Sequence, residues 1–508
     1  MRALSFPPAD RAALSTGVSV LLLSVLAGQG AWAQELRIAH VTLVSPELAG
    51  PKRDVTVSIH EGRIASIAPG STGGASAAGP GVVVVDAHGL YLAPGLIDSH
   101  VHLEAIPGMT AEQERQHPDV ARAAREQIPR SVLQFGYTTL VDLNSAPQAM
   151  AAWKSHALVP DTYFCGGAVL MDGYPMNYLP EPERYAMTPY MLIEPGSAAP
   201  PGVDSAAHTP EAVVARMKED GAICVKTFFE RGFGGVHDLP VPQLVTIRAL
   251  VYTAHAAGLP VLMHANTSEA QRFALDAGVD IIAHGLWNWD EPLPASALTA
   301  RVKNVLDRVI ETHTGWQPTI QVLFGLRDLT HSAFLGDPML KRVLPEKLIT
   351  WYSSGEGQWF RDQLAADFRT TDPEQLQKEG DRVFGALITR VERASAYLAA
   401  HKARLLFGTD TPSAPTYANP PGLNGFREMR NLKAAGLSPA QIFRMATIAN
   451  ARALHLDSEV GTVQVGKRAN LLLLHEDPTR SVEAYADIER IILGGRLIDP
   501  AELYPPAN

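Results

Sequence analysis

Two histidines one residue apart, His100 and His102, follow a short apolar segment and are the first residues whose spacing could do chemistry. Side chains at positions i and i+2 of a β-strand point to the same face, so the two imidazoles would lie side by side. Neighbouring imidazoles are suited to bind one divalent metal ion. A pair of structural histidines could have the same spacing, so the rest of the chain must decide between the two interpretations.

Four further polar residues each lie in or directly after a short apolar run. One of them is a lysine in the run Ala222–Phe229, where a bare ammonium ion would be costly to bury. Helix-like patterns separate some of these runs, for example at Val241–Ala257 and Ser268–Ala277. This alternation predicts parallel strands with crossover helices, and site residues at the carboxyl ends of the strands. The four residues are Lys226, His264, His284 and Asp410.

The order His, His, Lys, His, His, Asp at the ends of successive strands resembles the amidohydrolase superfamily of metal-dependent barrels. Arg37–Leu43 and Val55–Ile67, with a turn at Glu61-Gly62, look like the opening β-hairpins of that family. Gly461–Leu474 looks like its return from the barrel to a small β-domain. The most similar group is the composite-domain members related to imidazolonepropionase and prolidase. The resemblance implies an α/β fold with a (β/α)8 TIM-like barrel and a small β-sandwich domain built from both chain ends.

The expected division of the chain is a signal peptide at 1–33, a small β-domain at 34–93 plus 456–508, and a metal-dependent hydrolase barrel at 94–455. The second, third and seventh strands are expected at Tyr137–Leu143, Thr162–Val169 and Trp316–Val322. Insertions are expected at about 170–208, which is rich in Tyr, Met and Pro, and at about 326–402, which has a helical pattern. Each insertion would cover the catalytic face or pack as a structural or subunit contact.

The first 33 residues have the composition of an export signal. Arg2 and Arg11 accompany the apolar segment Gly17–Ala27, and Ala31–Ala33 forms a small-residue cleavage site. The apolar segment is too short for a permanent bilayer span, although an uncleaved anchor is the alternative. We therefore expect a periplasmic or secreted protein without a membrane partner after cleavage.

The charge balance argues against partners that select basic surfaces. The formal net charge of the 508-residue chain is −10, and loss of residues 1–33 with their two arginines and one aspartate makes it −11. Nucleic acid and anionic membranes are therefore not expected as partners. A small-molecule substrate is expected, and a homo-oligomer is possible.

The chain contains two cysteines, Cys165 and Cys224. Cys224 would share a strand face with Lys226 and therefore point into the barrel. An exported protein could join the two cysteines. We expect buried core thiols in preference to a disulfide, and extra metal ligands as the least favoured role.

The resemblance implies that the six chemistry-bearing residues bind two divalent ions. His100, His102 and Asp410 would bind the first ion. His264 and His284 would bind the second. Zinc fits this set of nitrogen and oxygen donors best, although metal availability also decides occupancy.

Lys226 would supply the anion that bridges the two ions in such a site. Burial lowers the pKa of a lysine, and the neutral amine can add CO2 to form a carbamate with two oxygens. The alternative is a salt-bridged or snorkelling lysine in an enzyme with one metal ion.

A water between two such ions would lose a proton near neutral pH and become a hydroxide nucleophile. Asp410 would accept that proton and pass it to the leaving group. The sequence therefore predicts an exported metal-dependent hydrolase that cleaves an amide bond in a peptide, an N-acyl amino acid or a cyclic amide by a metal-bound hydroxide. Expected substrate contacts come from Asn266, Arg231, His237 and Tyr174.

Three other functions compete with this prediction. A mononuclear deaminase on the same fold would place an acidic proton shuttle a few residues after His264, where this chain has Thr267. A lactone or ester hydrolase would use the same residues on a different bond. A metal-stabilised binding protein would need the fold without the complete set of ligands.

Overall fold

The structure is a computed structural model that describes residues 35–70, 81–180, 183–234, 236–293, 297–413 and 415–506. The predicted signal peptide at residues 1–33 lies outside this part of the chain. Among the helices of the described residues, none is long and apolar enough to cross a membrane.

A seven-stranded parallel sheet provides the carboxyl ends at which the chemistry-bearing residues lie. Its strands pair in chain order, so each strand lies beside the one that precedes it in the sequence. Parallel neighbours need a crossover connection, which the helices between the strands supply. The strands are β6 (Leu96–Val101), β7 (Tyr137–Asp142), β8 (Asp161–Ala168), β9 (Cys224–Phe228), β10 (Val261–His264), β11 (Ile281–Ala283) and β12 (Gly315–Gln317).

Residues 404–411 connect the two edges of this sheet. At the β12 edge, the backbone N–H of Leu406 donates to the carbonyl of Trp316 at 3.0 Å. At the β6 edge, the backbone N–H of Asp410 donates to the carbonyl of His100 at 2.7 Å. The predicted α/β class is confirmed. The parallel sheet is curled, and this segment brings its first and last strands together.

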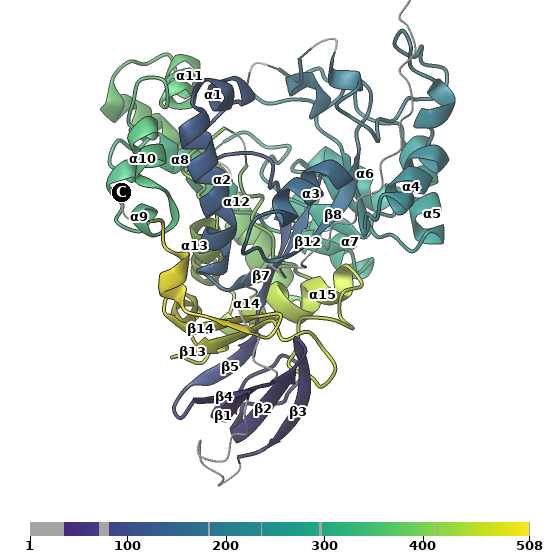
Figure 1. The fold of residues 1–508 in the computed structure, drawn as a ribbon. Helices are drawn as coiled ribbons and strands as arrows, with labels where there is room; N and C mark the ends of the chain where they lie inside the picture. The colour runs from purple at the N-terminus through teal and green to yellow at the C-terminus, as the bar shows by residue number, and fades with distance from the viewer. Residues whose placement is uncertain are drawn as a thin grey trace, which may run out of the picture.

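Helices surround this sheet, as Figure 1 shows. Local sequence signals explain several of their ends. Helix α6 begins where the Thr267 hydroxyl accepts a hydrogen bond from Ala270 N at 3.0 Å, and it ends at Gly278, whose φ of 79° suits glycine. The helices are α1 (Ala111–Gln116), α2 (Pro118–Leu133), α3 (Pro147–Lys154), α4 (Pro210–Glu219), α5 (Leu244–Ala256), α6 (Ser268–Ala277), α7 (Ala300–Glu311), α8 (Gln321–Leu329), α9 (Leu340–Val343), α10 (Glu346–Tyr352), α11 (Trp359–Asp367), α12 (Pro373–Ala400), α13 (Leu423–Ala434), α14 (Pro439–Arg444) and α15 (Asn450–Ala453).

Strands from both ends of the chain form a second sheet, of eight strands. Figure 1 shows the purple amino-terminal strands beside the yellow carboxyl-terminal ones. The junction is an antiparallel pair in which Leu472 of β13 lies opposite Ala93 of β5. The predicted turn at Glu61-Gly62 joins β2 and β3, with φ values of 49° and 74°. The strands are β1 (Glu35–Leu43), β2 (Lys52–His60), β3 (Arg63–Pro69), β4 (Val82–Asp86), β5 (Tyr91–Pro94), β13 (Leu471–Leu474), β14 (Ile488–Leu493) and β15 (Arg496–Ile498).

The predicted strand at 316–322 is too long, because β12 ends at Gln317. Pro318 follows and has no N–H to donate to a neighbouring strand. The buried carboxylate of Glu428 then accepts the backbone N–H groups of Ile320 at 3.2 Å and Gln321 at 2.7 Å. These bonds satisfy amides at the start of α8, so the chain turns into a helix.

The two long insertions differ in structure. The described residues of 170–208 contain short 3₁₀ turns at Met176–Tyr178, Glu183–Tyr185 and Ser205–His208. Residues 326–402 are mainly helical and include the 28-residue helix α12, as their pattern predicts.

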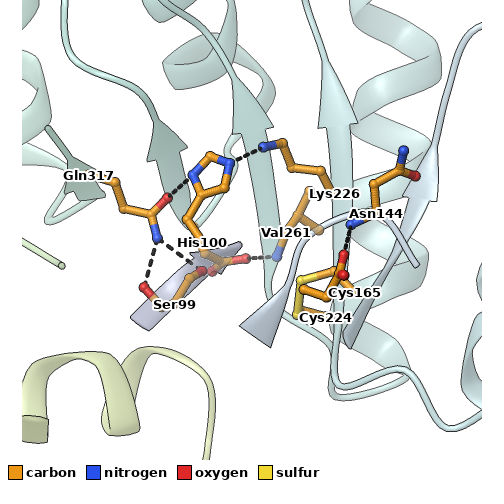
Figure 2. The surroundings of a disulfide bond; sticks show 10 residues. Ser99, His100, Asn144, Cys165, Cys224, Lys226, Val261 and Gln317 are labelled. Carbon is orange, nitrogen blue, oxygen red and sulfur yellow. Dashed lines mark hydrogen bonds between the residues drawn. A yellow bond between two sulfur atoms is a disulfide. The ribbon is translucent and has the colours of Figure 1, made fainter. Parts of the chain in front are cut away.

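The cysteines form a disulfide, so the expectation of free core thiols is wrong. Cys165 and Cys224 are register partners on the neighbouring strands β8 and β9, with their Cα atoms 4.4 Å apart. Both residues are fully buried and pack in a cluster with Leu262 and Ile281 of the sheet interior. Figure 2 shows the bond beside Lys226, on the same strand as Cys224. The sequence could not reveal this pairing, because it does not give the register of β8 against β9.

Replacement of both cysteines by alanine should lower the free energy of unfolding by about 2–4 kcal/mol, because the cross-link restricts the unfolded chain. The disulfide spans a sequence separation of 59 residues. Urea unfolding of the oxidised wild type and the double variant, followed by tryptophan fluorescence, measures the difference. A thiol assay on the denatured wild type is the control, and equal unfolding midpoints would contradict the stabilising role.

Candidate metal centre

The residues predicted to bind the first ion lie together at the junction of β6 and residues 404–411. His100 Nε2 and His102 Nε2 lie 3.0 Å and 2.9 Å from the same atom, Asp410 Oδ1. Lys226, the central residue of β9, places its Nζ 3.4 Å from His100 Nε2. One carboxylate oxygen, two imidazoles and a lysine amine therefore converge from three separate segments.

The residues predicted to bind the second ion lie directly beside the first group. The ring centroid of His284 lies 4.4 Å from that of His264 and 4.9 Å from that of His100. Within the described part of the chain, His100, His284 and Asp410 offer donor atoms that all lie within 4.8 Å of one another and could hold a metal ion. The structure thus brings all six predicted ligands into one cluster.

Gln317 determines which nitrogen of His100 carries the proton. Its amide nitrogen donates to Ser99 Oγ at 2.8 Å, so its oxygen Oε1 faces His100 Nδ1 at 3.2 Å (Figure 2). An amide oxygen only accepts hydrogen bonds, so Nδ1 must be the protonated nitrogen. The lone pair of Nε2 then points toward Lys226 and Asp410. The sequence did not identify Gln317 as part of the site, although it lies in the predicted seventh strand.

Burial keeps His100, His264 and His284 neutral. Loss of solvation lowers the pKa of His100 to about 3, and it lowers the pKa values of His264 and His284 as well. For Asp410, burial would raise the carboxyl pKa, but the nearby imidazoles of His100 and His284 hold it well below its usual range. The cluster therefore presents neutral imidazoles and an ionised carboxylate, the protonation states that metal ligation requires.

The Lys226 side chain is almost completely buried, with an exposed fraction of 1%. Its burial lowers the amine pKa to about 8, although the charge of Asp410 opposes this shift. An appreciable fraction of the amine is therefore neutral near physiological pH, as addition of CO2 requires.

Two of the predicted ligands have unusual backbone conformations. His284 has a φ of 80° and Asp410 has a φ of 58°, in the left-handed region that non-glycine residues rarely adopt. Such strained conformations are typical of functional sites, where the surrounding structure holds them in place.

A buried carboxylate that the sequence analysis missed, Glu230, lies beside His264. Its Oε2 is 3.1 Å from His264 Nε2 and accepts a hydrogen bond from Asn266 Nδ2 at 3.0 Å. Glu230 lies four residues after Lys226, just past the carboxyl end of β9. This position at the end of a parallel strand was the signal in the sequence that could have identified it. The predicted substrate contact Asn266 thus lies at the site, with its amide bonded to Glu230.

Of the other predicted substrate contacts, one lies at the cluster and two do not. The Tyr174 ring, from the 170–208 insertion, lies 4.9 Å from the His264 ring and also contacts Phe228 and Phe233. Arg231 is half-exposed and forms an ion pair with Glu269 at 2.9 Å. His237 is an exposed residue of the following loop. The structure therefore brings Tyr174 to the cluster, whereas it gives Arg231 a different partner and leaves His237 at the surface.

The sequence matches the amidohydrolase family over residues 91–293 and 364–498. The chain belongs to the amidohydrolase family. As a member it is a hydrolase acting on carbon–nitrogen bonds, and members typically depend on metal ions. The His/Asp group described above agrees with this dependence.

Individual relatives of this amidohydrolase are distant. An imidazolonepropionase from Myxococcus xanthus is 43% identical over 62 residues, which cover 12% of this chain and 15% of that relative. A prolidase complexed with N-methylphosphonate-L-proline has a similar fold, with a TM-score of 0.63 and 18% identity over 92% of this chain and 99% of its own. An ochratoxinase from A. niger has a TM-score of 0.62 and 18% identity over 94% of this chain and 98% of its own. These structures share the fold.

The metal-free protein should become more stable as the pH rises from about 8 to about 10.5. Lys226 has a folded pKa of about 8 against an ordinary value of 10.5, so the unfolded chain binds the extra proton in this window. Across this window the free energy of unfolding should rise by about 3 kcal/mol. Below pH 8 the amine is charged in both states, so the folded protein carries the full cost of burying that charge. Urea unfolding of the wild type and K226M between pH 7 and 10.5, without metal or bicarbonate, measures this rise. If the free energy of unfolding depends on pH in the same way in both proteins, the effect does not come from Lys226.

Proposed function

We propose that this amidohydrolase is an exported enzyme that uses two divalent ions, with zinc the best fit, to cleave an amide bond in a peptide, an N-acyl amino acid or a cyclic amide. One observation carries the proposal. His100 Nε2, whose lone pair is free when Nδ1 donates to Gln317, lies 3.0 Å from the carboxylate oxygen Asp410 Oδ1, and His102 Nε2 lies 2.9 Å from the same oxygen. A cation bound between these atoms would be ligated by both imidazoles and the carboxylate.

The donor set fits two ions better than one. His100, His102 and Asp410 would hold the first ion, and His264 and His284 would hold the second. When bound, such ions lower the pKa of a water molecule and polarise a substrate carbonyl. The buried imidazoles keep their lone pairs free for this purpose because their pKa values are low.

Lys226 would contribute further ligand oxygens as a carbamate. Its neutral amine attacks the carbon of CO2, the new N–C bond forms, and one proton leaves to solvent. The modification replaces a cation with an anion at a buried position beside His100, where bound dications would need negative charge. The low pKa of the amine supports this assignment.

Asp410 would transfer the proton during hydrolysis. Its Oδ1 contacts two histidines, and its low pKa keeps the carboxylate available as a base. It would take a proton from the attacking water and deliver it to the departing amine nitrogen. Tyr174, whose ring centroid lies 4.9 Å from that of His264, would contact the substrate beside that histidine.

Two observations support export. The first 33 residues have the pattern of a signal peptide. The buried Cys165–Cys224 disulfide is a bond that persists mainly in oxidising compartments such as the periplasm or the exterior of the cell.

We further propose that residues 404–411 take the place of the eighth strand of a (β/α)8 barrel. The backbone bonds that join them to β12 and β6 support this interpretation. The barrel would then span residues 94–455, and the eight-stranded sheet would be the core of a small β-sandwich domain built from residues 34–93 and 456–508.

The first test combines metal analysis with a substrate panel. Protein purified without chelator should contain about two divalent ions per chain and should release an amine from dipeptides, including prolyl dipeptides, or from N-acyl amino acids. The prolidase and ochratoxinase similarities motivate these choices. Lactones and aminopurines complete the panel. Release of ammonia with one ion per chain would replace the proposal by a deaminase, and lactone hydrolysis alone would replace it by an esterase-type activity.

Substitution of Asp410 by Asn should reduce kcat/KM on the best substrate by about 10²–10⁴-fold, because the amide cannot accept and return the proton. The amide oxygen retains one ligand atom, so elemental analysis should find most of the metal still bound. Asp276→Asn, which alters an exposed carboxylate paired with Arg308, is the matched control. Turnover close to that of the wild type would exclude the assigned role of Asp410.

A further inference from the structure

The proposed chemistry leaves Glu230 without a role. This carboxylate has an exposed fraction of 6%, and a buried carboxylate is costly unless hydrogen bonds satisfy its oxygens. Both oxygens have partners here. Oε1 accepts the backbone N–H of Gly232 at 2.9 Å, and Oε2 accepts from Asn266 Nδ2 at 3.0 Å. The remaining neighbour of Oε2 is His264 Nε2, at 3.1 Å.

The contact with Glu230 fixes the proton on His264. A carboxylate only accepts hydrogen bonds, so Nε2, which faces Glu230 Oε2 at 3.1 Å, carries the hydrogen. The Asn266 Nδ2 donor lies farther from Nε2, at 3.4 Å, and donates to Glu230 Oε2 at 3.0 Å. The neutral ring, which is the form that binds a metal ion, holds a single proton. Its other nitrogen, Nδ1, therefore has the free lone pair.

The surrounding backbone holds this arrangement in place. The carbonyl of Asn266 accepts the N–H groups of Trp287 at 2.9 Å and Asn288 at 3.1 Å. The N–H of Phe229 donates to the carbonyl of His264 at 3.0 Å, which ties the segment before Glu230 to the end of β10. The Asn266 amide cannot be reversed, because its oxygen would then face the Glu230 carboxylate. Glu230 thus has few alternative positions.

We propose that Glu230 is a positioning residue that orients His264 to bind its metal ion through Nδ1. Gln317 has the opposite effect on His100, which is left to bind through Nε2. This inference rests on the proposed function, since that proposal introduces the ions. Partners that orient ligating histidines in this way typically change metal affinity by about 10–100-fold when they are removed.

Zinc titration of chelator-treated protein, with a competing chromophoric chelator and excess bicarbonate, tests the proposal without any substrate. Glu230→Ala should lower the affinity for one of the two zinc ions by about 10–100-fold and leave the affinity for the other unchanged. Glu230→Gln should lose much less zinc affinity, because its amide oxygen can still accept a hydrogen bond from His264 Nε2. Glu269→Gln, which alters the exposed partner of Arg231, is the matched control and should bind both ions as the wild type does.

A crystal structure of the zinc-loaded wild type, with anomalous scattering to locate the ions, gives the second readout and does not depend on how the variants fold. Nδ1 of His264 on the zinc, with Nε2 on Glu230, is the expected result. Ligation through Nε2, or a Glu230 oxygen on the zinc, would overturn the positioning role. Equal losses in the Ala and Gln variants would also overturn it.

The failures of the two proposals are distinguishable. If the wild type binds two zinc ions and Glu230→Ala binds both equally well, only the role of Glu230 is wrong. If the wild type binds no zinc at either position, the proposed function and the role of Glu230 fail together.

Discussion

The hydrogen bond from the backbone N–H of Asp410 to the carbonyl of His100 joins the end of the parallel sheet to its beginning. The cluster depends on this junction, because His100 and His102 come from the first strand and Asp410 comes from residues 404–411. A small shift of either segment would separate the carboxylate oxygen from both imidazoles. The left-handed backbone of Asp410 shows that local conformational preference is overruled to make this contact.

Burial is the second constraint, and it works together with the junction. His100, His264 and His284 remain neutral because they are removed from water, and Lys226 has a lowered pKa for the same reason. A neutral imidazole has only one free lone pair, so the neighbours of each ring decide which nitrogen can bind a ligand. Gln317 and Glu230 perform this function for His100 and His264, and both are themselves fixed by further hydrogen bonds. The outer layer of polar side chains is thus as much a part of the site as the donors.

The sequence was sufficient to predict which residues converge and the class of fold. His100 and His102 are two residues apart, so a β-strand places their side chains next to each other. The other four residues lie in or after short apolar runs, in an order that resembles a known family; they are Lys226, His264, His284 and Asp410. Partners across strands were not predictable in the same way. The Cys165–Cys224 bond and the contact of Glu230 with His264 depend on the register between neighbouring strands, which no local pattern encodes. The early end of β12 depends on Glu428, a residue of α13 far along the chain.

The pairing of β5 with β13 also has a consequence for the order of folding. Residues 91–94 and 471–474 lie at opposite ends of the chain, yet they are adjacent in the middle of one sheet. Contacts between such distant segments form slowly, because a long loop must be closed first. Until the carboxyl-terminal strands arrive, β5 exposes an unpaired edge that other chains could extend. A chain whose amino-terminal strands fold first therefore carries an open sheet edge until residues 471–474 pair with β5.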